Sequence, residues 1–426
     1  MSLIEVKNVT KIFGPHPKEA LEQYRAGLSK EELLAQTGHT LGLSDVSLTI
    51  EKGEIFVIMG LSGSGKSTLI RHFNRLIDPT DGHILVNGED VVTMSGRELE
   101  QFRRTKMSMV FQRFGLMPHR TVLQNVAYGL RVRGVSRAER EEKAMEWIER
   151  VGLAGYEAQY PTQLSGGMQQ RVGLARALAT DAEILLMDEA FSALDPLIRS
   201  QMQDQLIELQ SELGKTIVFI THDLDEALRI GDHIAILKDG RLSQVGTPPE
   251  ILLRPADDYV TDFVRDVNRA RVLTVETVMK PPKMRLTGEN IDHALEEMRR
   301  TGVTYGYVVE DERFRGVATQ ESLEAALSSQ DNRNLYEIAE EGPTLSAADA
   351  LEAALPAALE AVYPLPVVDE EGKLMGIVSP SEMSSALTPP KSPSPEEPAN
   401  DTGESTPAGR AVGEAGTLPE KEKLEG

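Results

Sequence analysis

An eight-residue run rich in glycine and serine, Gly60-Leu61-Ser62-Gly63-Ser64-Gly65-Lys66-Ser67, constrains the fold of this 426-residue chain more than any other feature. It follows the apolar run IFVIM and precedes the helical run TLIRHFNRL, so we predict a strand, a phosphate-binding loop and a helix. The glycines let backbone N–H groups turn inward around phosphate oxygens, and the helix presents its positive end. A glycine turn without a ligand is the alternative.

This phosphate loop (residues 60–67) predicts nucleotide chemistry. The charge of Lys66 suits the outer phosphates, and the Ser67 hydroxyl suits a magnesium ion. The predicted nucleotide-binding residues are Gly60, Ser62, Gly63, Ser64, Gly65, Lys66, Ser67 and Thr68.

A second apolar run, Ile184 to Met187, ends in the carboxylates Asp188 and Glu189. We predict that Asp188 lies near the magnesium ion and Glu189 near the attacking water, because hydrolysis requires those two distinct roles. A buried strand that simply ends in solvated acids is the alternative.

The sequence LSGGMQ precedes the helical stretch QRVGLARALA and offers a second anion site at a helix start. Its small residues Ser165, Gly166 and Gly167 would expose backbone N–H groups. By itself, a Ser-Gly-Gly run is often only a loop.

From Met1 to about Leu253, short aliphatic runs alternate with longer helical stretches, which indicates an α/β domain. EIFVIMG, EILLMDE and TIVFITH are predicted buried strands. Asn87-Gly88 and Asp239-Gly240 predict hairpins, so the sheet should be mixed. Residues of about 15–42 are a predicted helical insertion, in which Ser29 and Glu32 form a capping box.

Composition excludes several classes of function. Asp and Glu outnumber Lys and Arg by 67 to 45, which opposes nonspecific binding to nucleic acid or anionic lipid. The absence of cysteine excludes disulfides and thiolate metal sites. There is neither a secretory signal pattern at the N-terminus nor an apolar run near the ~18 residues of a membrane span, so we expect a cytoplasmic protein.

Two later segments resemble one another: YVVEDERFRGVATQESL from Tyr307 and PVVDEEGKLMGIVSPSEM from Pro366. In each, a strand, an acidic turn, a second strand and a helix start follow in order, and Gly316 corresponds to Gly376. We predict a paired module over 271–387, with halves of about 271–327 and 328–387. Residues 388–426 contain seven Pro and no aromatic residue, which predicts a disordered tail.

The phosphate loop, LSGGMQ, LLMDEAFSALD and a later THD occur in the order and approximate spacing of ABC-transporter ATPases, a family that the chain resembles. The resemblance implies an ATPase domain over 1–265, with a helical subdomain at about 113–180. It also implies a head-to-tail dimer, in which the LSGGMQ signature of one copy closes over ATP held by its partner. Met168 departs from the commonest glutamine without removing the N–H groups.

Further roles follow from the same resemblance. Gln112 would sense magnesium, as one of its ligands, and the transmembrane partner. His222 would be the γ-phosphate switch, and Asp195 would lie in the dimer-facing loop. Phe13 would stack on adenine, a role that any flat ring can fill, with a core phenylalanine as the alternative.

The segments VTKIFG, GLSKEELLAQTG and MDEAFSALDPLIRSQMQDQL resemble ATP-binding subunits of glycine betaine/proline importers over residues 3 to about 270. This implies import of a compatible solute such as glycine betaine, proline or choline. The subunit would be peripheral, at the cytoplasmic face of the plasma membrane. It would act with a membrane permease and, indirectly, with an extracytoplasmic solute-binding protein.

The paired module resembles a CBS domain pair. In pairs that bind adenine nucleotides, a carboxylate follows the strand-ending Thr or Ser by three positions; Glu382 fits this rule and Ser322 does not. A regulatory nucleotide and a purely structural packing module therefore both stay open. The rival functions for the whole chain are another ABC importer, a soluble ABC ATPase outside transport and a regulator without hydrolysis.

Overall fold

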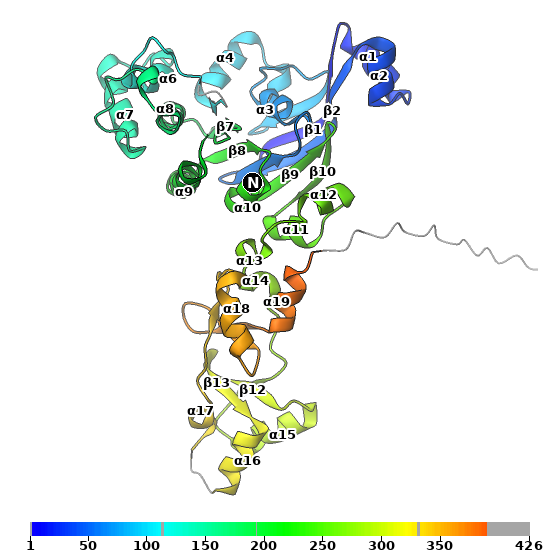
Figure 1. Ribbon diagram of the computed structural model, residues 1–426, viewed down its shortest axis with the longest axis vertical. Coiled ribbons are helices and arrows are strands. Elements are labelled where there is room, and N and C mark those ends of the chain that lie inside the picture. Colours follow the sequence, from blue (N-terminus) through cyan, green and yellow to red (C-terminus); the bar gives the residue numbers. More distant parts are fainter. Residues whose placement is uncertain (1, 112–114, 193, 330–332, 390–426) are drawn as a thin grey trace, which may run out of the picture. The chain divides into compact units, whose positions relative to one another are not determined.

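The computed structural model describes residues 2–111, 115–192, 194–329 and 333–389. Figure 1 shows its helices and strands. The predicted disordered tail lies outside the described residues, apart from its first two positions. Among the described helices, none is both long enough and apolar enough to cross a membrane.

The central element of the N-terminal part is a six-stranded sheet in the order β10-β9-β3-β8-β7-β6, parallel except for β10. Every residue of β3 and β7 is buried, as expected for parallel strands covered on both faces. The three strands predicted from their apolar runs are confirmed as β3, β7 and β8. The bounds are β3 Ile55–Met59, β6 Met107–Val110, β7 Ile184–Asp188, β8 Thr216–Thr221, β9 His233–Lys238 and β10 Arg241–Gly246.

A second, four-stranded sheet is antiparallel, in the order β2-β1-β4-β5. Both predicted hairpins are present: Asn87-Gly88 joins β4 to β5, and Asp239-Gly240 joins β9 to β10, all four residues having positive φ. The first hairpin therefore lies outside the parallel core. The bounds are β1 Ser2–Phe13, β2 Thr40–Glu51, β4 Asp81–Val86 and β5 Glu89–Asp90.

Helix α3 (Lys66–Phe73) packs between the two sheets. Its Leu69, Ile70 and Phe73 share one buried cluster with residues of both sheets, such as Val46 and Ile58. Alternate β3 residues point into the cluster on the other face of the six-stranded sheet, where α9 (Pro196–Leu213) packs. The helix that follows the phosphate loop is thus held by core packing on both sides.

The predicted insertion forms two helices, α1 (Pro17–Arg25) and α2 (Lys30–Thr37). Ser29 and Glu32 make the predicted capping box at the start of α2. Leu21 and Leu33 form a small core with Ile12 and Leu41 of the flanking strands. The insertion is therefore anchored where β1 ends and β2 begins.

A group of helices lies between β6 and β7 in sequence, and Figure 1 shows α6, α7 and α8 grouped together. They share their own buried cluster. Their bounds are α5 Val122–Val126, α6 Tyr128–Val132, α7 Arg137–Arg150, η2 Pro161–Gln163 and α8 Gly166–Leu178. The remaining helices of this part are η1 Val91–Thr93, α4 Gly96–Thr105, α10 Leu224–Ile230, α11 Pro248–Leu253 and α12 Asp258–Phe263.

The C-terminal part contains two three-stranded sheets with the same order of parallel and antiparallel pairs, β11-β12-β13 and β14-β15-β16. Its strands are β11 Arg285–Thr287, β12 Tyr305–Glu310, β13 Arg313–Thr319, β14 Leu345–Ser346, β15 Leu365–Val368 and β16 Leu374–Val378. Its helices are α13 Arg269–Val272, α14 Val275–Val278, α15 Ile291–Thr301, α16 Gln320–Ser328, α17 Leu335–Ile338, α18 Leu351–Glu360 and α19 Pro380–Leu387.

The two glycines matched in the sequence occupy equivalent places. Gly316 pairs with Val308 and Gly376 with Val367, and the strand register shifts immediately after each pair. A side chain on Gly316 would lie 2.6 Å from the Glu340 carbonyl oxygen. The predicted internal repeat of strand, turn, strand and helix start is therefore present in the backbone.

Candidate nucleotide-hydrolysis site

The phosphate loop leaves β3 and enters α3 through glycines that no other residue could replace easily. Gly60 has φ +146, and a Cβ there would lie 2.2 Å from the Leu237 carbonyl oxygen. Gly65, with φ +104, is the N-cap of α3. The sharp turn therefore brings the backbone to the positive end of a buried helix.

Lys66 is 5% exposed, and its ammonium group donates to the carbonyl oxygens of Gly60 (2.8 Å) and Leu61 (3.0 Å). Burial lowers the pKa of Lys66, while the nearby Glu189 and Asp188 carboxylates oppose this shift. The Ser64 hydroxyl is buried without a hydrogen-bond partner among the described residues. A cradle with a buried cation and an unsatisfied hydroxyl fits a polyanion such as a phosphate chain.

Asp188 ends β7 and is held by two groups of α3. The Ser67 hydroxyl donates to its Oδ1 at 3.0 Å, and Arg71 donates to its Oδ2 at 3.3 Å. Ser67 and Asp188 were predicted to share a magnesium ion, and they do lie together. Hydroxyl and carboxylate oxygens are the donor set that magnesium prefers. Among the described residues, no cluster of three or more His, Cys, Asp or Glu side chains offers another metal site.

The contact of Arg71 with Asp188 is not predicted from the sequence. Arg71 stands four residues after Ser67, so the two lie on one face of α3. That spacing is the available signal, but it does not say which strand end the face meets.

Glu189 and His222 lie side by side at the ends of the neighbouring strands β7 and β8. Nδ1 of His222 and Oε2 of Glu189 are 3.8 Å apart. Glu189 has φ 46, a left-handed conformation that is uncommon for a residue with a side chain, and its N–H donates to the Ile220 carbonyl. The carboxyl edge of the sheet thus brings together Lys66, Ser67, Asp188, Glu189 and His222.

Phe13 ends β1 and is 39% exposed, so it is not a core phenylalanine. Its ring lies over Gly42, where an added Cβ would come within 2.6 Å of a ring carbon. The Gly42 carbonyl lies close to the phosphate loop, since a Cβ added at Gly65 would be 2.8 Å from its oxygen. An exposed flat ring beside the loop fits the predicted stacking on adenine.

The signature residues and Asp195 lie together at a cavity away from the phosphate loop. Ser165 is the N-cap of α8 and accepts from the Met168 N–H, while Asp195 is the N-cap of α9 and accepts from the Ile198 N–H. Both line a cavity of about 520 Å³ together with Gly166 and Gly167. None of the residues of the phosphate loop lines this cavity.

The remaining predicted site residues are Ser62, Gly63, Thr68 and Gln112. Ser62 and Gly63 are exposed in the phosphate loop, and Thr68 is half-buried in the first turn of α3, where its carbonyl accepts from His72. Gln112 lies outside the described residues.

In the C-terminal pair, the two predicted carboxylate positions differ. Glu382 forms a capping box with Ser379 and an ion pair with Lys280 at 3.2 Å. Burial opposes ionisation there, but the bonds from Ser379 and Lys280 lower the pKa of Glu382. At the equivalent helix start, the Ser322 hydroxyl accepts from the Thr319 N–H, so a neutral group completes that capping box.

Comparison with protein families identifies two matches: the ABC transporter model over residues 43–192 and the CBS domain model over residues 338–388. Among solved structures, a bacterial ABC transporter cassette determined as a dimer is similar, with a TM-score of 0.50 and 35% identity, over 58% of this chain and 99% of the other. The fold class predicted from the sequence, an ABC-type ATPase domain followed by a CBS pair, is confirmed. ATP is the nucleotide that this fold binds.

Two curated relatives cover most of the chain. The glycine betaine/proline betaine transport system ATP-binding protein ProV of Salmonella typhimurium is 50% identical over 389 residues, which are 90% of this chain and 97% of that protein. The glycine betaine transport ATP-binding protein OpuAA of Bacillus subtilis is 48% identical over 90% of this chain and 92% of its own length. This chain therefore belongs to the family of ATP-binding subunits of ABC transport systems that includes these glycine betaine transport proteins.

Proposed function

We propose that this chain hydrolyses ATP to drive the import of a compatible solute such as glycine betaine, proline or choline through a membrane permease. The observation that carries the proposal is the convergence of Lys66, Ser67, Asp188, Glu189 and His222 at one sheet edge. The class of solute is inferred from the relatives. Two have glycine betaine in their names, and one at 36% identity is named as a choline transport protein of Bacillus subtilis.

Each residue has a chemical task. The phosphate loop binds the phosphates through backbone N–H groups, and the Lys66 ammonium exchanges its carbonyl partners for phosphate oxygens. Glu189 orients the attacking water and accepts its proton, while His222 donates to the terminal phosphate. Ser67 and Asp188 would hold a magnesium ion, which would neutralise charge on the phosphates. Gln112 is the further proposed ligand.

The site is completed by a second copy of the chain. The signature helix start at 165–167 presents its N–H groups in a cavity that the same chain's phosphate loop does not reach. A head-to-tail dimer would place this cavity over ATP held by the partner copy. Asp195 lines the same cavity, in agreement with its proposed position at the dimer contact.

For the permease, we propose a groove of about 390 Å³ between α4 and α6 as the docking surface. Tyr128 and Val132 expose 37% and 40% of their surface there, beside the cationic Arg103 and Arg104. An apolar strip with a cationic rim fits a short amphipathic segment of a membrane protein. We propose that the subunit binds the permease there at the cytoplasmic face of the membrane, with the extracytoplasmic solute-binding protein as an indirect partner.

The decisive experiment measures ATP-dependent solute transport. The chain is co-expressed with a permease that co-purifies with it, and the complex is placed in vesicles with ATP inside the compartment that faces the subunit. Glycine betaine, proline and choline are offered on the other side with the binding protein. ATP-dependent uptake of one of them supports the proposal, whereas uptake of an unrelated solute only would assign the chain to another ABC importer.

A soluble ABC ATPase outside transport would be recovered without any membrane partner. Co-purification distinguishes this alternative, since a transport subunit is recovered with its permease.

Regulation by the CBS pair is proposed at Glu382, whose carboxylate stays ionised beside Lys280. In the full chain, Glu382→Gln should change the response of ATP hydrolysis to adenine nucleotides or ionic strength. Ser322→Ala is the matched control at the other helix start. Identical responses in all three proteins would leave the pair with a packing role.

A further inference from the structure

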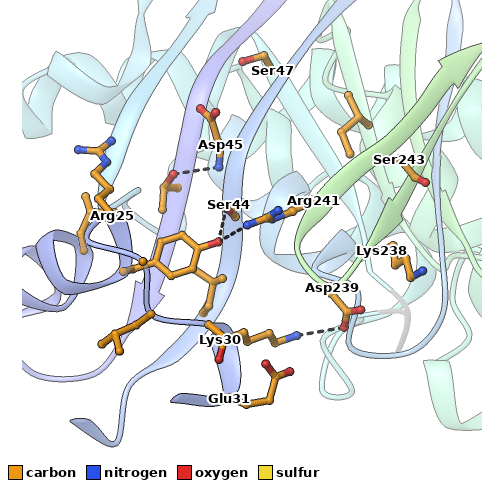
Figure 2. A pocket seen from close by; sticks show the side chains of 18 of the residues that line it. Arg25, Lys30, Glu31, Ser44, Asp45, Ser47, Lys238, Asp239, Arg241 and Ser243 are labelled. Atoms are coloured by element: carbon orange, nitrogen blue, oxygen red, sulfur yellow. Dashed lines mark hydrogen bonds and ion pairs between the residues drawn. The ribbon is translucent and has the colours of Figure 1, made fainter. Parts of the chain in front are cut away.

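Beside the phosphate loop lies a cavity of about 1120 Å³, bounded by the inserted helices, strand β2 and the β9–β10 hairpin. Figure 2 shows Lys30, Ser44, Asp239 and Arg241 around it. Charged side chains of both signs line this cavity, and several of them bond across it. Those bonds connect the insertion with the nucleotide site.

On one side of the cavity, the hairpin turn is bonded to the phosphate loop. The Gly240 N–H donates to the Ser64 carbonyl at 3.0 Å, and the Gly240 carbonyl accepts from the Ser44 N–H at 2.8 Å. Gly240 has φ +80, and a Cβ there would lie 2.8 Å from the Gly42 carbonyl oxygen. The turn therefore fits closely between β2 and the loop.

The bond to the Ser64 carbonyl also constrains the N–H group of the next residue, Gly65. A trans peptide is planar, with its C=O and N–H pointing in opposite directions. Holding the Ser64 carbonyl toward Gly240 therefore sets the direction of the Gly65 N–H. Inward-pointing N–H groups are what such a loop uses to bind phosphate.

On the other side, the insertion holds the turn. Arg241 donates to the Tyr24 hydroxyl at 2.7 Å, and this hydroxyl lies 2.9 Å from the Ser44 hydroxyl. Lys30 makes an ion pair with Asp239 at 3.2 Å, which Figure 2 marks with a dashed line. The Tyr24 ring packs against the small apolar core of the insertion.

We infer that Tyr24, Lys30 and Arg241 are positioning residues for ATP: through the turn at 239–241, the inserted helices keep the Ser64–Gly65 peptide oriented for phosphate binding. The inference rests on the proposed nucleotide site and adds a role for the insertion. It predicts an effect on nucleotide affinity and not on the chemical step, because none of the three residues contacts Glu189 or His222.

The first test uses the full chain and Tyr24→Phe, which keeps the ring in its apolar core and removes only the hydroxyl. The Kd for a fluorescent ATP analogue and the KM for ATP should rise about threefold to tenfold, as expected for one or two lost hydrogen bonds. The kcat should stay within about twofold. In a double-mutant cycle, Ser44→Ala added to Tyr24→Phe should cost less than the two separate effects combined.

The second test uses Lys30→Met, which removes an ion pair between a partly buried lysine and an exposed aspartate. The Kd should rise about twofold at low salt and the change should vanish at high salt. Lys30→Arg should restore wild-type affinity. Lys18→Met is the matched control, because Lys18 is an exposed lysine of α1 with no ion pair among the described residues.

Wild-type affinity in both Tyr24→Phe and Ser44→Ala would overturn the inference, and so would a fall in kcat at unchanged KM. A wild-type chain that fails to bind ATP would instead refute the proposed nucleotide site. Thermal unfolding of each variant separates a local change of affinity from loss of the fold.

Discussion

The phosphate loop and the signature are both predicted anion sites at helix starts, but they differ in burial and in their partners within the chain. Lys66 and Asp188 are buried, and both already have partners within the chain. Ser165 and Gly166 are exposed at the start of α8, and the cavity that they line contains no catalytic side chain. One site is preassembled by the core, whereas the other is an exposed surface that, in the proposed dimer, would meet a phosphate bound by another copy.

The largest expected effect concerns the preassembled site. Glu189→Gln keeps the size of the side chain and removes its ability to accept a proton, so phosphate release should fall at least about 100-fold. ATP binding, measured with a fluorescent analogue, should persist. Glu208→Gln, on the exposed side of α9, is the control. Normal turnover in Glu189→Gln would mean that another group activates the water.

The signature is tested by Gly166→Asp, which adds an anion where the second copy's phosphate is expected. An acidic residue in the first helical turn favours the helix, so stability should be kept while hydrolysis falls at least about tenfold. Gly166→Asn is the neutral control. ATP binding to the monomer should not change.

A mixing experiment sharpens the same contrast. A head-to-tail dimer of Lys66→Ala and Gly166→Asp subunits has one site with both defects and one with neither. The mixture should therefore hydrolyse ATP although each protein alone does not. A mixture that does not hydrolyse ATP would indicate that both halves of the site come from one chain.

A smaller effect is expected at the permease groove. Val132→Glu should reduce recovery of the permease with the tagged subunit about tenfold and leave ATP hydrolysis by the free subunit unchanged. Val245→Glu is a matched control, since both valines are 40% exposed. Equal recovery of the permease with both variants would show that the permease docks on another surface of the subunit.

The smallest effect concerns the packing behind the phosphate loop. Burial lowers the pKa of His72 in α3 from 6.5 to about 4. Between pH 6.5 and pH 4, His72 is therefore protonated in the unfolded chain and neutral in the folded chain. Stability is therefore full above pH 6.5 and falls as the pH drops, by about 2 kcal/mol at pH 5. His72→Leu should lose less of its thermal stability between pH 7 and pH 5 than the wild type; an equal loss would show that His72 does not titrate in this way.

The sequence predicts what is local. Apolar runs locate the strands, two-residue Gly-containing turns locate the hairpins, and the Ser29–Glu32 spacing locates a helix start, because each pattern reflects bonding between near neighbours. The phosphate loop belongs to the same class. Its ligand follows from the order of glycines and from the strand and helix beside it.

The sequence does not predict contacts that depend on how distant elements pack. The bond between Tyr24 and Arg241 spans 217 residues, and Arg71 reaches Asp188 across 117. Nor does residue type show that Asp195 caps a helix while it lines the signature cavity. Such roles come from the register of sheets and helices, which a single sequence does not contain.

The exposure of the helix start at 165–167 also has a kinetic consequence. If a working site needs two copies, the hydrolysis rate of the free subunit rises with the square of its concentration when the subunit is dilute. Two subunits held together by a permease would meet at an effective concentration set by that scaffold, and the rate would then be first order in the complex. Reaction order thus reports whether ATP consumption is confined to assembled transporters.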